Sequence, residues 1–346
     1  MRVYLDHNAT TPLRAEARDA MVGAMGILGN PSSVHREGRA AKAALEKARQ
    51  EIASAFGADG AEVVFTSSAT EAAAMALAGR DISGAFIEHD AVRAWINEDL
   101  ASDADGVVQP QEPEKSTLQL ANSETGVVQT LPSGLAVTDA TQAFGKLPMA
   151  FNWLGADMAI VSAHKLGGPK GIGALVMKRG IDLVARLKGG GQEMGRRAGT
   201  ENIIGAVGFA AAAKAAQLDI ESGAWQRVEK LRDLLESTIE NDAKETIFFG
   251  KGATRLPNTS CFAIPGWKGE TQVMQMDLAG FAISAGSACS SGKVKASAVL
   301  QAMGYDATTA SSAIRVSLGC DNTEDDVLRF AESWLAQWRK FRARAA

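Results

Sequence analysis

Cysteine is scarce in this chain of 346 residues, which contains only three, Cys261, Cys289 and Cys320. An odd number of widely separated cysteines is neither a disulfide framework nor a zinc-binding pattern, and it fits a reducing cytosol. The chain also lacks a surplus of positive charge, because its formal net charge is -4. Nucleic acids and anionic membrane surfaces select for basic proteins, so neither is expected as the main partner.

Long apolar runs are absent as well. No stretch approaches the roughly 20 residues that a membrane-spanning helix needs. The first six residues contain no apolar signal core. With 46% hydrophobic and 22% charged residues, the composition is that of an ordinary soluble globular protein. We therefore expect a cytoplasmic protein without a membrane partner.

Short apolar and β-branched runs alternate with helical stretches in the first part of the chain. This pattern predicts an α/β fold built on a mainly parallel sheet with crossover helices. An amphipathic helix is expected from about Arg39 to Phe56, because apolar residues recur there at helical spacing and Gly57 follows. The predicted strands are residues 63–65, 85–87, 117–120, 135–138, 158–162 and 174–177.

A second set of elements occupies the rest of the chain. It begins with a predicted helix over residues 225–239 and closes with one from Thr323 towards Arg344, and its predicted strands are residues 260–264, 281–284 and 314–318. A chain of this length exceeds what one hydrophobic core usually serves, so we expect two domains, or one large domain with an appendage. We place the boundary near Ser222.

Polar residues follow the predicted strands at the edge where open α/β sheets bind ligands, outside the carboxyl ends of the strands. After residues 63–65 comes a run of small and hydroxyl residues, 66–71, that opens a helix. A helix N-terminus of this kind suits a phosphate group. The alternative reading is an ordinary N-cap by Ser68 or Thr70.

Two further strand ends indicate a pyridoxal-phosphate (PLP) site. Asp139 follows one strand and could pair with a protonated pyridine nitrogen, which keeps the ring an electron sink. Lys165 follows the next strand, next to His164, where it could anchor the cofactor as a Schiff-base lysine. A solvated loop lysine is the alternative for Lys165. His89 follows another strand end, and a lone histidine is more often structural than catalytic.

Cys289 and Arg315 are candidates for the substrate chemistry. Small residues flank Cys289 on both sides, which suits an accessible nucleophilic thiolate, whereas Cys261 and Cys320 lie in or beside apolar strands as inert thiols. Arg315 is a charge in an otherwise apolar strand. It is either paired structurally or presented to the carboxylate of an amino acid.

Together these residues resemble the cysteine desulfurase family of fold-type I PLP enzymes, within the class V aminotransferases. The resemblance covers nearly the whole chain, and many motifs occur in the family's order: residues 4–12, 29–35, 88–89, 124–126, 139–142, 162–165, 197–200 and 286–289. It implies a large PLP-binding domain over residues 13–222, with a mainly parallel seven-stranded sheet. It also implies a smaller α+β domain over residues 1–12 and 223–346 that carries the cysteine loop.

The resemblance implies roles for individual residues. Lys165 matches the cofactor lysine, Asp139 the pyridinium partner and Cys289 the persulfide cysteine. Thr200 matches a phosphate contact that the family supplies from the neighbouring subunit, which implies a homodimer. The other implied roles are an acid/base histidine stacked on the ring for His89, a contact to the ring oxygen for Gln142, the phosphate cradle for Ala69, Thr70, Ser162 and His164, and substrate binding for Arg315 and Asn30.

Some positions depart from the family pattern. Ser123 stands where an asparagine normally meets the cofactor and substrate. The connection from Gly126 to Asp139 is too short for the helix that family members place there, and residues 79–115 look trimmed.

We therefore expect a cysteine desulfurase that converts L-cysteine to L-alanine and passes sulfur from Cys289 to an acceptor such as an iron-sulfur scaffold protein. No metal site is expected. The alternatives are a class V aminotransferase or selenocysteine lyase on the same site, and a weakly active homologue that acts as a binding subunit.

Overall fold

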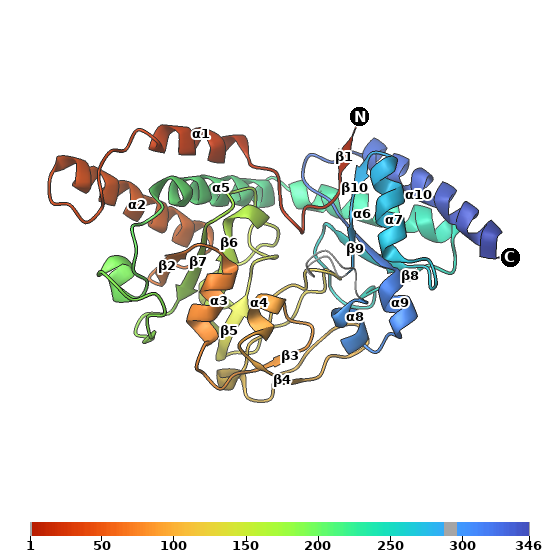
Figure 1. Cartoon of the computed structure of the whole chain (residues 1–346), viewed down its shortest axis with the longest axis horizontal. Coiled ribbons are helices and arrows are strands. Elements are labelled where there is room, and N and C mark those ends of the chain that lie inside the picture. Colours follow the sequence, from red (N-terminus) through yellow and green to blue (C-terminus); the bar gives the residue numbers. More distant parts are fainter. Residues whose placement is uncertain (1, 287–295, 346) are drawn as a thin grey trace.

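The computed structural model describes residues 2–286 and 296–345. Figure 1 shows two groups of elements side by side, one around strands β2 and β5–β7 and the other around β8–β12. The N-terminal strand β1 lies with the second group, and the chain then crosses to helix α1 in the first. The segment between β1 and α1 therefore passes between the two groups.

The first group is built on a sheet with the strand order β2 (Glu62–Thr66), β7 (Gly173–Met177), β6 (Ala156–Ser162) and β5 (Leu135–Asp139). Single bridges at Thr117 and Ser116 connect β5 to β3 (Ser83–Ala85), which pairs with β4 (Asn97–Leu100). Every pairing in this series is parallel except the two made by β7. The mainly parallel sheet predicted from the sequence is thus confirmed, with β7 as its antiparallel strand. Its continuous part has four strands rather than the expected seven, because only single bridges connect it to the β3–β4 pair.

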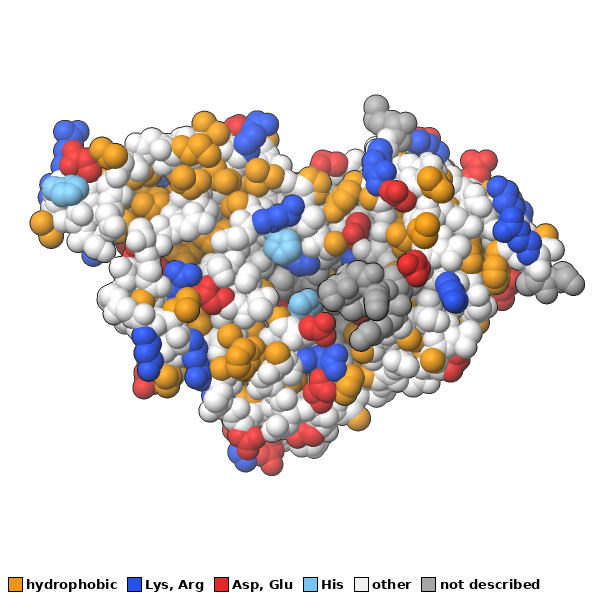
Figure 2. All heavy atoms as spheres, in the orientation of Figure 1, with side chains coloured by type: hydrophobic (Ala, Val, Ile, Leu, Met, Phe, Trp, Pro, Cys, Tyr) orange, Lys and Arg blue, Asp and Glu red, His pale blue; other side chains and the backbone are white. Residues whose placement is uncertain are grey.

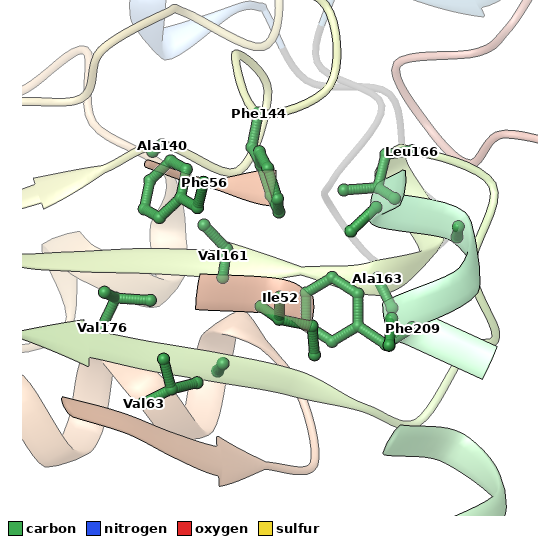
Figure 3. Close-up of a cluster of buried hydrophobic side chains, with 14 of the residues drawn as sticks. Ile52, Phe56, Val63, Ala140, Phe144, Val161, Ala163, Leu166, Val176 and Phe209 are labelled. Atoms are coloured by element: carbon green, nitrogen blue, oxygen red, sulfur yellow. The ribbon is translucent and has the colours of Figure 1, made fainter. Parts of the chain in front are cut away.

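Both faces of this sheet are buried. Successive side chains of a strand point to opposite faces, and here both sets pack against helices. Val63, Val161 and Val176 pack with Ile52 of α2 (Arg36–Ala55) and Phe209 of α5 (Ile203–Glu221) in one cluster (Figure 3). Their neighbours in the strands, among them Val64, Ile160 and Leu175, pack on the other face against α3 (Ala69–Leu77). Helices thus cover both faces of the sheet, and the carboxyl ends of its strands remain as the place for a site.

Helix α5 is the one described helix that is apolar and long enough to cross a membrane, judged by length and composition alone. Half of its apolar stretch is buried in the protein. It packs against α1 (Ala15–Ala24) and α2. Small residues allow this close approach, since a Cβ at Gly208 would lie 2.6 Å from the Met21 side chain. We interpret α5 as a core helix.

The second group contains an antiparallel sheet with the order β11 (Ser284–Ala285), β12 (Ala313–Ser317), β9 (Thr259–Ala263) and β8 (Ile247–Phe248). Strand β1 (Val3–Tyr4) pairs in parallel with β10 (Phe281–Ala282). Trp334 of α10 (Glu324–Ala345) and Phe262 meet in its core. The remaining helices are α4 (Asp90–Arg93), α6 (Ala224–Asp242), α7 (Gly269–Leu278), α8 (Ala298–Ala302) and α9 (Ala307–Ser312), with short 3-10 turns η1 (Pro113–Lys115), η2 (Phe151–Trp153), η3 (Ala163–Lys165) and η4 (Gln192–Gly195).

The structure differs from the predicted elements in several places; of the predicted strand 85–87, for example, only Ala85 lies in β3. Strand β4 was not predicted, because its polar sequence Asn97–Leu100 has no apolar alternation and it pairs only with β3. Residues 117–120 make single bridges and do not form a strand of their own. Residues 281–284 divide between β10 and β11, which belong to different sheets. The predicted boundary near Ser222 falls in the short turn between α5 and α6, and the division into two domains stays a prediction.

Candidate active site

Lys165 lies in η3, directly after β6 reaches its carboxyl end. Its Nζ donates to the backbone oxygens of Asn8, at 2.6 Å, and Ala9, at 2.9 Å. The Thr11 hydroxyl donates to the backbone oxygen of Lys165 at 2.9 Å. The segment that crosses between the two groups of elements therefore holds the lysine amine in a defined position.

Asp139 ends β5, the strand beside β6, and is in register with Ile160. Its Oδ1 accepts a hydrogen bond from the backbone N–H of Thr141 at 2.9 Å. The carboxylate and the Lys165 amine thus follow the carboxyl ends of neighbouring parallel strands. This is the arrangement predicted from the sequence.

The N-terminus of α3 lies beside the same edge. Ser68 is its N-cap, with Oγ accepting from the Glu71 N–H at 3.3 Å, and the phosphate site at the same helix end stays a prediction. Gly173 of β7 approaches so closely that a Cβ there would lie 2.8 Å from the backbone carbon of Ser68 and 3.1 Å from the Ala69 nitrogen. Ser162, buried on β6, pairs with Gly173. The structure therefore brings Ala69 and Ser162 together, and Thr70 follows Ala69 as an exposed residue in the first turn.

His164 lies next to the lysine, with Nδ1 3.2 Å from the Thr10 hydroxyl oxygen. Burial, with the nearby Lys165 and Lys170, lowers the pKa of His164 to about 4. The imidazole is therefore neutral near pH 7, and it can serve a phosphate as a single N–H donor without adding a charge.

His89 follows β3 and caps α4, with Nδ1 accepting from the Ala91 N–H at 3.1 Å. A neutral imidazole that accepts at Nδ1 carries its proton on Nε2. Beside it, Glu88 is buried, and burial raises its pKa to about 8. Glu88 Oε1 accepts from the Gln119 N–H at 2.7 Å, whereas Oε2 has no partner among the described residues.

Arg315 lies on β12, between β11 and β9, and only 3% of its surface is exposed. Its guanidinium forms an ion pair with Asp6 at 2.8 Å and donates to the Ser123 backbone oxygen at 2.9 Å. Its Nε has no partner within the described part of the chain. The arginine is therefore both structurally paired and able to donate one more hydrogen bond.

Glu124 is an acidic residue that sequence reasoning gave no role. Its Oε2 accepts from the Ser297 hydroxyl at 2.5 Å. Burial raises the pKa of Glu124 to about 7, although the neighbouring Arg315 and His89 lower it. Its only sequence signal is its place in the family motif at residues 124–126, which does not predict burial, because the burial depends on Ser297, far away in the chain.

Two more residues that sequence reasoning missed, Asn8 and Lys146, connect Gln142 with Lys165. The Gln142 Nε2 donates to the Asn8 backbone oxygen at 2.9 Å, and the Lys146 Nζ donates to Gln142 Oε1 at 2.9 Å and to Asn8 Oδ1 at 3.0 Å. Asn8 and Lys146 are almost completely buried. The only sequence signal for Lys146 is its position four residues after Gln142, which is too weak to predict burial of a lysine.

The remaining predicted residues lie away from this cluster or outside the described residues. Asn30 is exposed in the α1–α2 connection, at the far left end of Figure 1, and bonds only locally to the Ser32 N–H among the described residues. Thr200 is exposed after η4. Burial raises the thiol pKa of Cys261, and that of Cys320 to about 11, as expected of unreactive thiols. Cys289 lies outside the described residues.

The described residues fit a phosphorylated pyridine aldehyde. Lys165 provides an amine, Asp139 a carboxylate beside it, and the α3 N-terminus an anion site. A further donor of matching chemistry is the Thr141 hydroxyl, which is buried without a partner among the described residues. Figure 2 shows histidine and basic side chains in the middle of this face of the molecule. No group of three or more acidic, histidine or cysteine residues that could hold a metal ion occurs in the described part of the chain.

Comparisons with known proteins identify the family. The class-V aminotransferase family model matches residues 3–92 and 115–330, so the chain belongs to this PLP-dependent family. The chain is 39% identical to a cysteine desulfurase of Cereibacter sphaeroides, over 96% of this chain and 94% of that one. It is 34% identical to cysteine desulfurase IscS of Dictyoglomus turgidum, over 94% of this chain and 91% of that one.

A solved NifS-like protein from Rickettsia africae has the same fold, with a TM-score of 0.89 and 29% identity over 98% of this chain and all (100%) of that one. The unmatched residues 93–114 fall within the segment that looks trimmed in the sequence. They contain β4, and no helix is described between Gly126 and β5, in agreement with the shortened connection.

Proposed function

We propose that this chain is a cysteine desulfurase that takes sulfur from free L-cysteine and leaves L-alanine. The observation that supports this most is the placement of Lys165 and Asp139 at neighbouring strand ends. Arg315 bonds to Ser123 and to Asp6 of the segment that crosses between the two groups of elements. The relatives named as cysteine desulfurases, which align over nearly the full length, support the same substrate.

Several residues would hold PLP. Lys165 would bind it covalently, Asp139 would pair with the ring nitrogen, and Gln142 and Ser123 would face the ring substituents. Ala69, Thr70, Ser162 and His164 would receive the phosphate. When bound, PLP withdraws electrons from the substrate carbon atoms and so makes proton removal and C–S cleavage possible.

Lys165 and His89 would move the protons. The Lys165 amine, held by the backbone oxygens of Asn8 and Ala9, would be released to take the Cα proton of cysteine. His89, protonated on Nε2, would be the second proton-transfer group. Its orientation is fixed by the Nδ1 contact to Ala91.

Arg315 would bind the substrate carboxylate. A buried guanidinium N–H without a partner costs free energy, which an incoming carboxylate would recover. Asp6 and the Ser123 carbonyl hold the other two nitrogens, so the plane of the guanidinium is set before substrate arrives. Asn30 would assist from the α1–α2 connection of the neighbouring subunit.

Cys289 would accept the sulfur. Its thiolate attacks the Sγ of cysteine, a sulfur–sulfur bond forms, and the Cβ–Sγ bond breaks with its electron pair left on the carbon skeleton. Protonation of Cβ completes alanine, and the enzyme retains a persulfide. The exchange balances without an external oxidant or reductant. The persulfide sulfur would pass to an acceptor such as an iron-sulfur scaffold protein.

The functional unit would be a homodimer. Asn30 and Thr200 make no described contact with Lys165. Their segments nevertheless border one hollow of about 440 Å³, which is lined by Pro31 and Ser32 from one segment and by Gln192, Met194 and Glu201 from the other. The α1–α2 connection also exposes apolar side chains, including Leu28 (90%) and Val34 (88%), and Figure 2 shows hydrophobic side chains gathered over this end. A second subunit would cover this face and receive both residues in its own site.

Each subunit would divide into a PLP-binding domain, residues 13–222, and a smaller domain, residues 1–12 and 223–346, and the enzyme would work in the cytoplasm. The product assay tests the proposed function. Purified protein loaded with PLP and given L-cysteine under reductant should release alanine and sulfide in equal amounts. A keto acid in place of alanine would indicate an aminotransferase, and turnover of selenocysteine alone would indicate a lyase. Either result would contradict the proposal.

A further inference from the structure

Lys146 is a buried amine for which the proposed reaction has no use. Only 2% of its surface is exposed. Its hydrogen-bond acceptors are the neutral side-chain oxygens of Asn8 and Gln142, and within residues 2–286 and 296–345 no ion pair involves it. Burying a lysine amine without a carboxylate partner costs folding free energy, so we expect a specific role of this amine in the site.

The hydrogen-bond chemistry fixes the orientation of the Gln142 amide. The Lys146 amine donates to the Gln142 oxygen. The Asn8 carbonyl can only accept, so the atom that faces it must be the nitrogen. Nε2 carries two hydrogens, and for the second one the described residues contain no acceptor. That N–H is available to a bound molecule.

The same amine also fixes Asn8. The Asn8 Oδ1 accepts from the Lys146 amine and, at 3.1 Å, from Asn258 Nδ2. The Asn8 Nδ2 donates to the Thr259 hydroxyl at 2.8 Å. Asn8 is thereby held at its side chain, while its backbone oxygen accepts from both Gln142 and Lys165. The two lysine amines are thus linked through one residue.

We propose that Lys146 is a positioning residue, which orients the Gln142 amide to present an N–H to the cofactor ring oxygen and fixes the Asn8 carbonyl that holds the Lys165 amine. This inference rests on the proposed PLP function. The charged or titratable groups near Lys146 are Lys165, Arg315, His7 and the Cys320 thiol. Burial, followed by Lys165 and Arg315, places the pKa of Lys146 well below its usual value, in keeping with an amine bound by neutral acceptors.

The pH midpoint of the cofactor's visible absorbance band tests this role. A donor to the ring oxygen favours the deprotonated form of the bound cofactor, so its loss should raise the midpoint. For Lys146→Met we expect a rise of about one pH unit, the size of one lost hydrogen bond to a charged group. Gln142→Leu should give a similar rise, and the double variant should rise no further. Lys178→Met, which removes a lysine from an exposed pair with Asp157, is the matched control and should leave the midpoint unchanged.

Thermal unfolding of the cofactor-free protein supplies a second measurement, in which the Lys146→Met and Gln142→Leu effects should be non-additive because the residues are in contact. If Lys146→Met does not fold, Lys146→Gln, which keeps an N–H donor on a shorter side chain, should show a smaller rise in the midpoint. An unchanged midpoint in a folded Lys146 variant, or additive unfolding effects, would overturn the inference. A wild-type protein with no visible band would instead overturn the proposed function, and the unfolding experiment would still decide whether Lys146 and Gln142 are coupled.

Discussion

At the scale of single residues, the site depends on polar groups whose properties come from burial. Sequence reasoning identified Lys165, Asp139, His89 and Arg315 because each follows or interrupts an apolar strand. It could not identify Glu124 or Lys146 as buried residues, because the groups that enclose them are distant in sequence. Nor could it show that Arg315 is bonded to Asp6, since that pair joins the two ends of the chain.

Glu88 provides a pH-dependent prediction at this scale. Its folded-state pKa of about 8 lies above the usual value, so between about pH 4.5 and 8 the folded protein binds a proton that the unfolded chain has released. Stability from this group is therefore present at low pH and is lost as the pH rises through that window. Glu88→Gln keeps the acceptor for Gln119 without the titration.

We expect Glu88→Gln to unfold at a higher temperature than the wild type at pH 8, with a smaller difference at pH 5, in thermal scans followed by circular dichroism. Glu98→Gln changes a more accessible carboxyl in an ion pair with Arg93 and is the control. An equal effect of Glu88→Gln at both pH values would show that the buried carboxyl is not protonated on folding.

At the scale of elements, the strands and long helices were predictable because apolar periodicity determines them. Strand β4 was not, because its residues are polar and only pairing with β3 orders them. The same is true of residues 189–201, which the sequence shows only as a glycine-rich loop. The structure holds this segment by ion pairs from Glu193 to Arg49 and from Arg197 to Glu71, at 2.7 and 2.8 Å.

Glu193 is the residue on which this segment depends most. It adopts a left-handed backbone conformation, with φ of 49°, and its buried carboxylate also accepts from the Phe65 N–H at 3.1 Å. Glu193→Gln should cost about 1–3 kcal/mol of unfolding free energy, because it weakens a charged hydrogen-bond set around a buried arginine contact. It should also increase proteolysis within residues 189–201.

Chemical denaturation and limited proteolysis would measure both effects. Glu240→Gln, which removes one partner of an exposed ion pair with Lys251, should cost no more than about 1 kcal/mol. A Glu193→Gln protein as stable and as protease-resistant as the Glu240→Gln protein would contradict the assigned anchoring role.

At the scale of the whole molecule, the described contacts within one chain do not bring all the expected site residues together. The described contacts unite Lys165, Gln142, Asn8 and Lys146, whereas Asn30 and Thr200 lie on the exposed face around the hollow. This separation is not predictable from periodicity, because which parts of one chain serve another depends on association. The family resemblance alone indicated it, through Thr200.

Mixed dimers test the shared site. Lys165→Ala subunits lack the cofactor lysine, and Thr200→Ala subunits lack the donated phosphate contact. Co-refolding equal amounts of the two should make about half of the dimers hybrids, each with one site that contains both intact residues, so PLP affinity should return for about a quarter of all sites. Light scattering and equilibrium dialysis would measure mass and occupancy. A monomer that binds PLP with full affinity would contradict the shared site.

The central claim is that Cys289 receives sulfur at the site where Lys165 binds PLP. One measurement on the Cys289→Ser protein, loaded with PLP and given L-cysteine, tests it most directly. Mass spectrometry of trapped protein, with alanine quantified in the same sample, would report persulfide and product together. We expect the variant to keep the cofactor absorbance and respond to cysteine, yet to carry no persulfide and form almost no alanine. Cys261→Ser and Cys320→Ser should retain near wild-type turnover, because burial already suppresses those thiolates. Alanine and sulfide production by Cys289→Ser at the wild-type rate would contradict the account.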